Sequence, residues 1–268
     1  MNLGRILLLT MLSLFAIPLR ADSPAASSPG TQPALQNLSP REQQIRQWLS
    51  DLASLEAPFR QMARINLMSL KPSELPTLRK VCLQAVPLNR PQLESLKEIV
   101  AQLYLAGELE KECKLDKEGA DNPSGFVGVR LGLGRTDDGE RSEAIPGIVI
   151  YRRIIGFVGY RTLQDGDIII GLQEEPGLHM DKLKEFTDAV GARGPGDEIH
   201  LHLIRAGKEM VVPIKLDGKP AWVRNSSRVL GDDPEDQPID ERIALANHFW
   251  ETEFAVGIDP DLSDDSRK

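Results

Sequence analysis

The stretch Asp165-Gly166-Asp167-Ile168-Ile169 decides the fold of this chain. Its polar turn leads into a β-branched run, which predicts a turn followed by a buried strand. Further on, the apolar positions from Met180 to Val190 recur at helical spacing, and this pattern ends at Gly191. A strand, a turn and an amphipathic helix in this order predict a small domain that mixes strands and helices.

Four more strand-like segments surround this stretch. Two alternating segments, Glu198 to Arg205 and Lys208 to Leu216, are joined by Ala206-Gly207, which predicts a hairpin. Upstream, Phe126 to Leu131 and Gly147 to Arg153 have the composition of strands. Residues 125 to 216 are therefore predicted to hold five strands and one long helix.

This order of elements resembles a PDZ domain with the strand order of bacterial secreted PDZ proteins. Four segments carry the resemblance: Gly125 to Val129, Leu163 to Ile169, the helix opened by Asp181, and Gly194 to Asp197 with the strand and turn that continue to Glu209. One departure is the turn from Gly156 to Thr162, where the family usually has Gly-Ser-Pro and small residues. Larger side chains fill this turn here: Phe157, Val158 and Tyr160.

The resemblance implies that the domain binds an extended peptide or a protein C-terminus. The family's carboxylate-binding loop corresponds to the amides of Phe126, Val127 and Gly128. The side chains implied in peptide binding come from the first groove strand and from the helix: Val129, Leu131, Leu183, Phe186 and Val190. For Leu183 and Phe186, filling the core is the alternative.

Length and charge limit the classes of function. A chain of 268 residues, 41% of them hydrophobic, is long enough for two small domains. The formal net charge of -8 argues against nucleic acid or an anionic membrane as a partner, because both require a basic face. The sequence has no P-loop and no dinucleotide fingerprint, so no cofactor is expected.

The N-terminus is typical of a secretory signal. A basic residue, Arg5, precedes the apolar run from Ile6 to Ile17, and Leu19-Arg20-Ala21 suits cleavage after residue 21. We therefore expect residues 1–21 to be a signal peptide and the protein to be periplasmic or secreted. An uncleaved membrane anchor is the alternative, although the run of about 12 apolar residues is short for a span. Residues 22–38 are rich in Ser, Pro and Ala and predict a disordered linker.

Residues 39–107 predict a helical domain of unassigned role. Ser39, Pro40 and Glu42 form a strong helix start with the pattern of a capping box. Three more helical segments follow, ended by Pro-containing turns or by Gly107: Pro58 to Leu70, Ser73 to Val86 and Pro91 to Ala106. The paired helices resemble HEAT-type repeats.

The C-terminal extension, residues 219–268, is acidic and contains an amphipathic helix. Its apolar positions recur at helical spacing: Ile239, Ile243, Ala246, Trp250 and Phe254. We expect this helix to pack on its own PDZ-like or helical domain, with an exposed partner-binding helix as the alternative. The end of the chain, Ile258 to Lys268, is expected to be a solvated tail.

The cysteines and histidines are the candidates for a disulfide or a metal site. Cys82 and Cys113 permit one disulfide in an exported chain, and a buried thiol at Cys82 is the alternative. Neither has a metal-binding partner at ligand spacing, and His200 and His202 lack an obvious third ligand. No metal site is therefore expected.

The sequence also predicts that the chain is not an enzyme. Its four histidines are scattered, and no motif like Gly-Asp-Ser-Gly-Gly of the trypsin-like proteases that often accompany PDZ modules is present. The expected architecture is α+β and multidomain: an N-terminal helical bundle, a PDZ-like small β-sandwich or barrel at residues 123–218 with one long helix, and a C-terminal helix.

We expect an exported, non-catalytic protein that binds extended peptides or protein C-termini, with the membrane contacted only through an uncleaved signal if at all. One alternative is an accessory subunit that presents substrates to a separate protease. The other is a structural protein whose groove is blocked by its own C-terminal helix.

Overall fold

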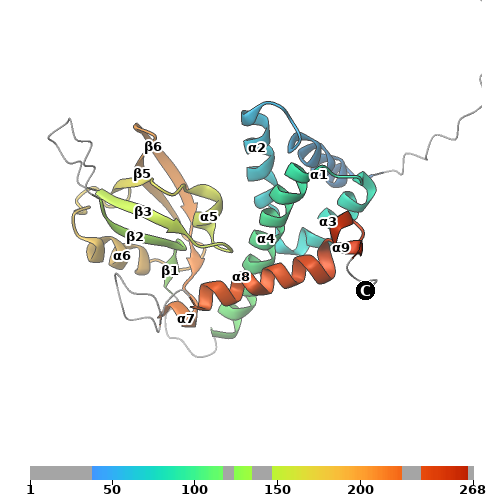
Figure 1. Cartoon of the computed structure of the whole chain (residues 1–268). Helices are drawn as coiled ribbons and strands as arrows, with labels where there is room; N and C mark the ends of the chain where they lie inside the picture. Colours follow the sequence, from blue (N-terminus) through green and yellow to red (C-terminus); the bar gives the residue numbers. More distant parts are fainter. Residues whose placement is uncertain (1–37, 117–123, 135–146, 225–236, 265–268) are drawn as a thin grey trace, which may run out of the picture. The chain divides into compact units, whose positions relative to one another are not determined.

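A computed structural model describes residues 38–116, 124–134, 147–224 and 237–264. Within these ranges the fold is α+β, with nine α-helices and a five-stranded antiparallel sheet (Figure 1). The chain divides into two compact units, residues 1–37 and residues 38–268, and all described residues belong to the second. The predicted signal peptide and all but the last residue of the predicted linker lie outside the described residues.

The helical part begins at the predicted capping box. Ser39 accepts a hydrogen bond from the amide of Glu42, and the Glu42 carboxylate accepts one from the amide of Ser39. The helices of this part are α1 Pro40–Asp51, α2 Ala57–Met68, the 3₁₀-helix η1 Pro72–Glu74, α3 Leu75–Ala85 and α4 Arg90–Asp116. Their apolar faces meet in one core that includes the fully buried Ile45, Leu67, Leu78, Leu96 and Leu103. Burial of these stripes, spaced at the helical period, holds the helices together.

Helix α4 continues past the predicted stop at Gly107 and ends at Asp116. A Cβ on Gly107 would lie 3.0 Å from the Cβ of Pro72, so the missing side chain allows α4 to approach η1. The glycine is therefore a close-packing residue within the helix rather than a C-cap. The helical segment predicted to end at Ala106 therefore continues to Asp116.

The strands are β1 Gly125–Phe126, β2 Val129–Gly134, β3 Gly147–Arg153, β4 Ile168–Leu172, β5 Glu198–Arg205, β6 Lys208–Lys215 and β7 Asp217–Gly218. The sheet has the order β2-β3-β4-β5-β6 with antiparallel neighbours, and β1 pairs separately with β7. Between β5 and β6, Ala206 and Gly207 have φ angles of 49° and 75°, which are the values that a tight hairpin of type I′ requires. The predicted hairpin is confirmed.

One face of the sheet packs on the long helix α6, Leu183–Gly191. This helix begins after Lys182, so the prediction that Asp181 opens it is wrong by two residues. The turn that departs from the PDZ pattern forms a short helix, α5 Val158–Thr162, preceded by the fully buried ring of Phe157. Phe157 and Val158 are thus core residues, while Tyr160 is half-buried.

The C-terminal elements are α7 Ala221–Arg224, α8 Gln237–Phe249, the π-helix η2 Trp250–Phe254 and α9 Pro260–Asp264. Figure 1 shows α8 beside α4, and the two helices are in contact. Trp250, Phe254 and Ile258 are buried in the core of the helical part. The C-terminal helix therefore packs on the helical part, and the expectation of a solvated tail is wrong at the buried Ile258, while Pro260 and Asp261 of α9 are exposed.

The two cysteines do not form a disulfide. Cys82 is fully buried in the helical core, where burial raises the pKa of its thiol to about 12. Cys113 lies near the end of α4, with its Sγ atom 3.7 Å from the carbonyl oxygen of Gly218. The disulfide alternative is wrong, and the buried-thiol alternative holds for Cys82. Among the described helices, none is long and apolar enough to cross a membrane.

Candidate functional site

Strand β2 is an edge strand of the sheet. It pairs with β3 on one side, and no described strand pairs with its other side. Backbone N–H and C=O groups along such an edge can pair with a further strand. Helix α6 contacts β2, so an apolar helix face lies close to this edge. We call this surface the β2–α6 edge, made of residues 129–134 and 183–191.

The turn that leads into the β2–α6 edge is fixed by a buried ring. Gly128 has a φ angle of 77°, and a Cβ at this position would lie 2.0 Å from the Cβ of Phe157. The carbonyl of Val127 accepts from the amide of Gly159, and the carbonyl of Gly128 accepts from the amide of Ile154, both at 2.9 Å. These bonds use the carbonyl oxygens of the turn and not its amides, so the N–H groups of Val127 and Gly128 take no part in them.

Phe157 is held by hydrogen bonds between the backbone of this turn and Gln102 and by a ring contact with Phe126. In α4, the buried side chain of Gln102 donates to the carbonyl of Phe157 at 3.1 Å and accepts from the amide of Gly156 at 2.7 Å. The rings of Phe157 and Phe126 also make an edge-to-face contact, with a centroid distance of 5.1 Å. The turn at Gly128 is thereby tied to the helical part of the chain.

Asp217 of β7 contacts both the β1 strand and the start of α5. It lies opposite Phe126 in the β1–β7 pair, and its carboxylate accepts from the amide of Val158, the first residue of α5, at 2.5 Å. Burial raises the pKa of this carboxyl group to about 6, while the hydrogen bond from Val158 and the charge of Arg161 act in the opposite direction. Asp217 and Gln102 were not singled out from the sequence, because their partners are distant in the chain.

The structure separates the predicted peptide-binding residues into two groups. Val129, Leu131 and Leu183 are half-buried and pack against the core beneath the β2–α6 edge. The others lie in the core or in the turn: Phe126, Val127, Gly128, Phe186 and Val190. The Phe186 and Val190 side chains are buried, so the core-filling alternative describes Phe186, while Leu183 stays at the surface of the core.

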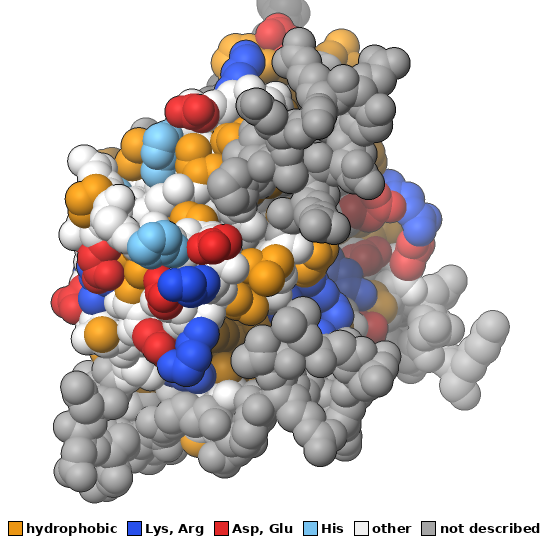
Figure 2. Space-filling model, turned by 90° about the vertical axis from the view of Figure 1, so that its left-hand side faces the viewer, with side chains coloured by type: hydrophobic (Ala, Val, Ile, Leu, Met, Phe, Trp, Pro, Cys, Tyr) orange, Lys and Arg blue, Asp and Glu red, His pale blue; other side chains and the backbone are white. Residues whose placement is uncertain are grey.

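The charged groups around α6 largely pair with each other. Lys182 pairs with Glu185 at 2.7 Å and Lys184 with Asp188 at 2.5 Å. Figure 2 shows the side of the molecule where α6, β2 and β3 lie, and its acidic, basic and hydrophobic side chains are interspersed. No single sign of charge dominates the described side chains in this view, which favours an uncharged or mixed ligand over a highly charged one.

The histidines of β5 lie beside acidic side chains. The Nδ1 atom of His200 lies 2.7 Å from Glu174, and the Nε2 atom of His202 lies 3.3 Å from Glu209. No group of three or more metal-ligating side chains occurs among the described residues.

The C-terminal helix does not cover the β2–α6 edge. The buried Trp250 ring stacks on Phe254, with a centroid distance of 5.6 Å, and both rings belong to the core of the helical part. The alternative in which a Trp250-containing helix blocks the groove is wrong.

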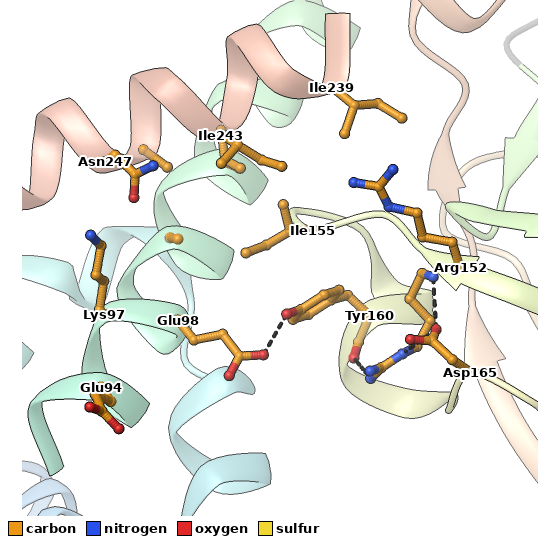
Figure 3. A pocket seen from close by; sticks show the side chains of 14 residues that line it. Glu94, Lys97, Glu98, Arg152, Ile155, Tyr160, Asp165, Ile239, Ile243 and Asn247 are labelled. Carbon is orange, nitrogen blue, oxygen red and sulfur yellow. Dashed lines mark hydrogen bonds and ion pairs between the residues drawn. The ribbon is translucent and has the colours of Figure 1, made fainter. Parts of the chain in front are cut away.

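A cavity of about 510 Å³ lies between α4, α8 and the end of β3. Figure 3 shows Ile155 in this space, with Ile239 and Ile243 of α8 on one side and the Tyr160 hydroxyl bonded to Glu98 on another. Burial raises the pKa of Tyr160, and so does its hydrogen bond to Glu98. The cavity lining combines aliphatic side chains with charges of both signs.

No protein-family model matches the sequence, and no curated protein matches it. Among solved structures, the chain is similar to the HtrA-type protease AlgW with a decapeptide, at 19% identity over 42% of this chain and 35% of that chain, with a TM-score of 0.34. It is also similar to a serine endoprotease from Yersinia pestis, at 22% identity over 43% of this chain and 35% of that chain, with a TM-score of 0.29. The chain thus spans about a third of the length of these proteins.

The prediction that the chain is not an enzyme is corrected by this comparison. The solved structures named above are proteases, which stands against that prediction. The scatter of the four histidines along the chain therefore does not assign a non-enzymatic role.

Replacing Asp217 with Asn should alter how stability depends on pH. Because the folded state holds the carboxyl proton to about pH 6 and the unfolded state releases it near its ordinary pKa, the parent should lose stability as pH rises from about 4 to 6. The amide of D217N carries no charge, so this variant should keep that stability, with a gain over the parent of up to about 3 kcal/mol above pH 6. Urea unfolding at pH 4 and pH 7.5 measures the difference. Equal differences between parent and variant at both pH values would contradict the account.

Proposed function

We propose that the chain binds an extended peptide by strand addition at the β2–α6 edge, as a PDZ-like domain does. The observation that supports this most is the position of β2, which ends the sheet and has α6 beside it. An added strand would satisfy the outward backbone groups of β2, and α6 would contact alternate side chains of that strand.

The turn at Gly128 suits the C-terminal carboxylate of such a peptide. The amides of Val127 and Gly128 are successive, and the left-handed conformation of Gly128 is of the kind that lets neighbouring N–H groups converge on an anion. Since the carbonyls of these residues are bonded to Gly159 and Ile154, the turn is held in place before a ligand arrives. Preorganisation of this kind lowers the entropic cost of binding.

The side chains beneath the edge favour an apolar residue at the peptide terminus. Val129, Leu131 and Leu183 are aliphatic and half-buried, so each keeps some surface that a ligand side chain could cover. An affinity on the order of micromolar is expected for a small strand-addition site. The alternative in which the chain presents peptides to a separate protease uses the same edge, so peptide binding is the first step in both.

Changing Val129 to Asp should weaken binding of a peptide with an apolar C-terminal residue by at least about 10-fold, because an unpaired charge would face the desolvated ligand. The matched control is V211D on β6, the opposite edge strand, where the Val211 side chain is 51% exposed. Fluorescence anisotropy with labelled peptides measures the three affinities, and circular dichroism confirms folding.

Equal affinities for the parent, V129D and V211D would contradict peptide binding at this edge, as would a lack of binding by the folded parent. If V129D does not fold, L133D replaces it, because Leu133 is an exposed residue of the same strand.

We further propose that the protein is exported through an N-terminal signal ending at Ala21. The support is the order of Arg5, the apolar run from Ile6 and the small residue at position 21. N-terminal sequencing of protein from its native cells should give a start at Asp22 or within a few residues. Recovery of the chain with Met1 in the membrane fraction would contradict export as a cleaved protein.

A further inference from the structure

Four arginines line one cavity of about 430 Å³ between α2 and the segment around α5. They are Arg64 of α2, Arg153 of β3, Arg161 of α5 and Arg205 of β5. Asp165 is the one carboxylate among the lining residues, although the whole chain has a net charge of -8. The lining of this cavity therefore carries more positive than negative side chains. We call this space the arginine cavity.

Three of these arginines are held in place by carboxylates. Arg205 pairs with the buried Asp167 through Nε and one terminal nitrogen, at 2.8 and 2.7 Å. Arg153 pairs with Asp165 at 3.0 Å, and Arg64 pairs with Glu98. Such pairs fix the side chains and remove much of their mobility before any ligand binds.

These pairs do not use all the donors of the guanidinium groups. In Arg205 and Arg153, the recorded bonds involve Nε and a single terminal nitrogen, so the other terminal nitrogen takes no part in them. In Arg64, one terminal nitrogen makes the contact with Glu98. Each guanidinium carries five N–H donors, so all three side chains keep donors that these bonds do not use.

Arg161 differs from the other three. It is half-buried, and it makes no ion pair with a carboxylate among the described residues. The charge of Arg161 acts on the buried carboxylate of Asp217, which does not line the cavity, so within the lining the four arginines face the single carboxylate of Asp165. An anion in the cavity would therefore meet more positive than negative side chains in the lining.

We propose that the arginine cavity binds a small multivalent anion with carboxylate or phosphate groups. Its volume lies within the range of about 300–1,000 Å³ that is usual for small-molecule sites. Guanidinium groups suit both chemical groups, because their planar N–H pairs can donate to two oxygens at once. The remaining polar lining, which includes Gln61, Thr162 and Gln164, fits a polar ligand better than an apolar one.

The arginine cavity is distinct from the peptide-binding edge. Its lining residues do not include any residue of β2 or α6. Arg153, Tyr160 and Asp165 also line the larger cavity of Figure 3, so these side chains stand between the two spaces. The proposal is consequently independent of peptide binding, and each can fail alone.

The test uses the full chain at low ionic strength, with citrate and pyrophosphate as probes in isothermal titration. The parent should bind at least one probe, and Arg161→Gln should weaken that binding by at least about 10-fold, since a charge-assisted contact is lost while the ion pairs of Arg64, Arg153 and Arg205 are kept. The control is R46Q, because Arg46 is an exposed arginine of α1 outside the cavity. Raising the salt concentration should reduce the affinity of the parent.

Weakening of citrate binding alone would assign a carboxylate ligand, and weakening of pyrophosphate binding alone would assign a phosphate ligand. If R161Q does not fold, R161K carries the test, with a smaller loss because it keeps the charge but not the paired donors. Equal affinities for the parent and the Arg161 variant, or no binding of either probe at millimolar concentration by the folded parent, would overturn the proposal.

Discussion

Gly128 and Phe157 share a space in which a second side chain cannot fit, and this contact governs the region around the β2–α6 edge. A Cβ on Gly128 would overlap the Phe157 side chain, and the positive φ angle of Gly128 is one that glycine adopts without strain. The ring is fully buried, so it cannot move aside without opening the core. The direction in which β2 leaves the turn is therefore set by a residue about thirty positions further along the chain.

The same ring links the two structural parts of the chain. Gln102 reaches from α4 to the backbone on both sides of the Gly156–Phe157 bond, and its side chain is 2% exposed. Buried amide groups with both partners satisfied favour a single arrangement, because losing one partner leaves a desolvated donor or acceptor. Leu109 and Ile239 pack with Phe157 in a shared apolar cluster, so α4 and α8 also support this arrangement. The helical part thus acts as a scaffold for the turn.

Local patterns in the sequence predicted the elements whose signals lie within a few residues. The capping box at Ser39, the hairpin at Ala206-Gly207 and the strand Gly147–Arg153 appear in the structure as expected, because neighbouring residues determine each of them. The continuation of α4 through Gly107 was missed, since that glycine is explained by contact with Pro72, which is distant in sequence.

The candidate site was predictable only in part, because several of its contacts join residues that are distant in the sequence. The resemblance to PDZ domains implied that Val129, Leu131 and Leu183 would lie at the groove, and they are half-buried beneath the β2–α6 edge. The roles of Gln102, Phe157 and Asp217 depend on contacts between distant segments, and no local pattern encodes such contacts. The arginine cavity likewise gathers residues from four separate elements.

Amide hydrogen exchange with and without a peptide that ends in an apolar residue tests the central claim most directly. Strand addition at the β2–α6 edge should slow exchange at the amides of residues 127–134, because an added strand and a bound carboxylate would protect them. Exchange along β6, at the opposite edge of the sheet, should not change. Protection at β6, or peptide binding without any protection in residues 127–134, would contradict the account.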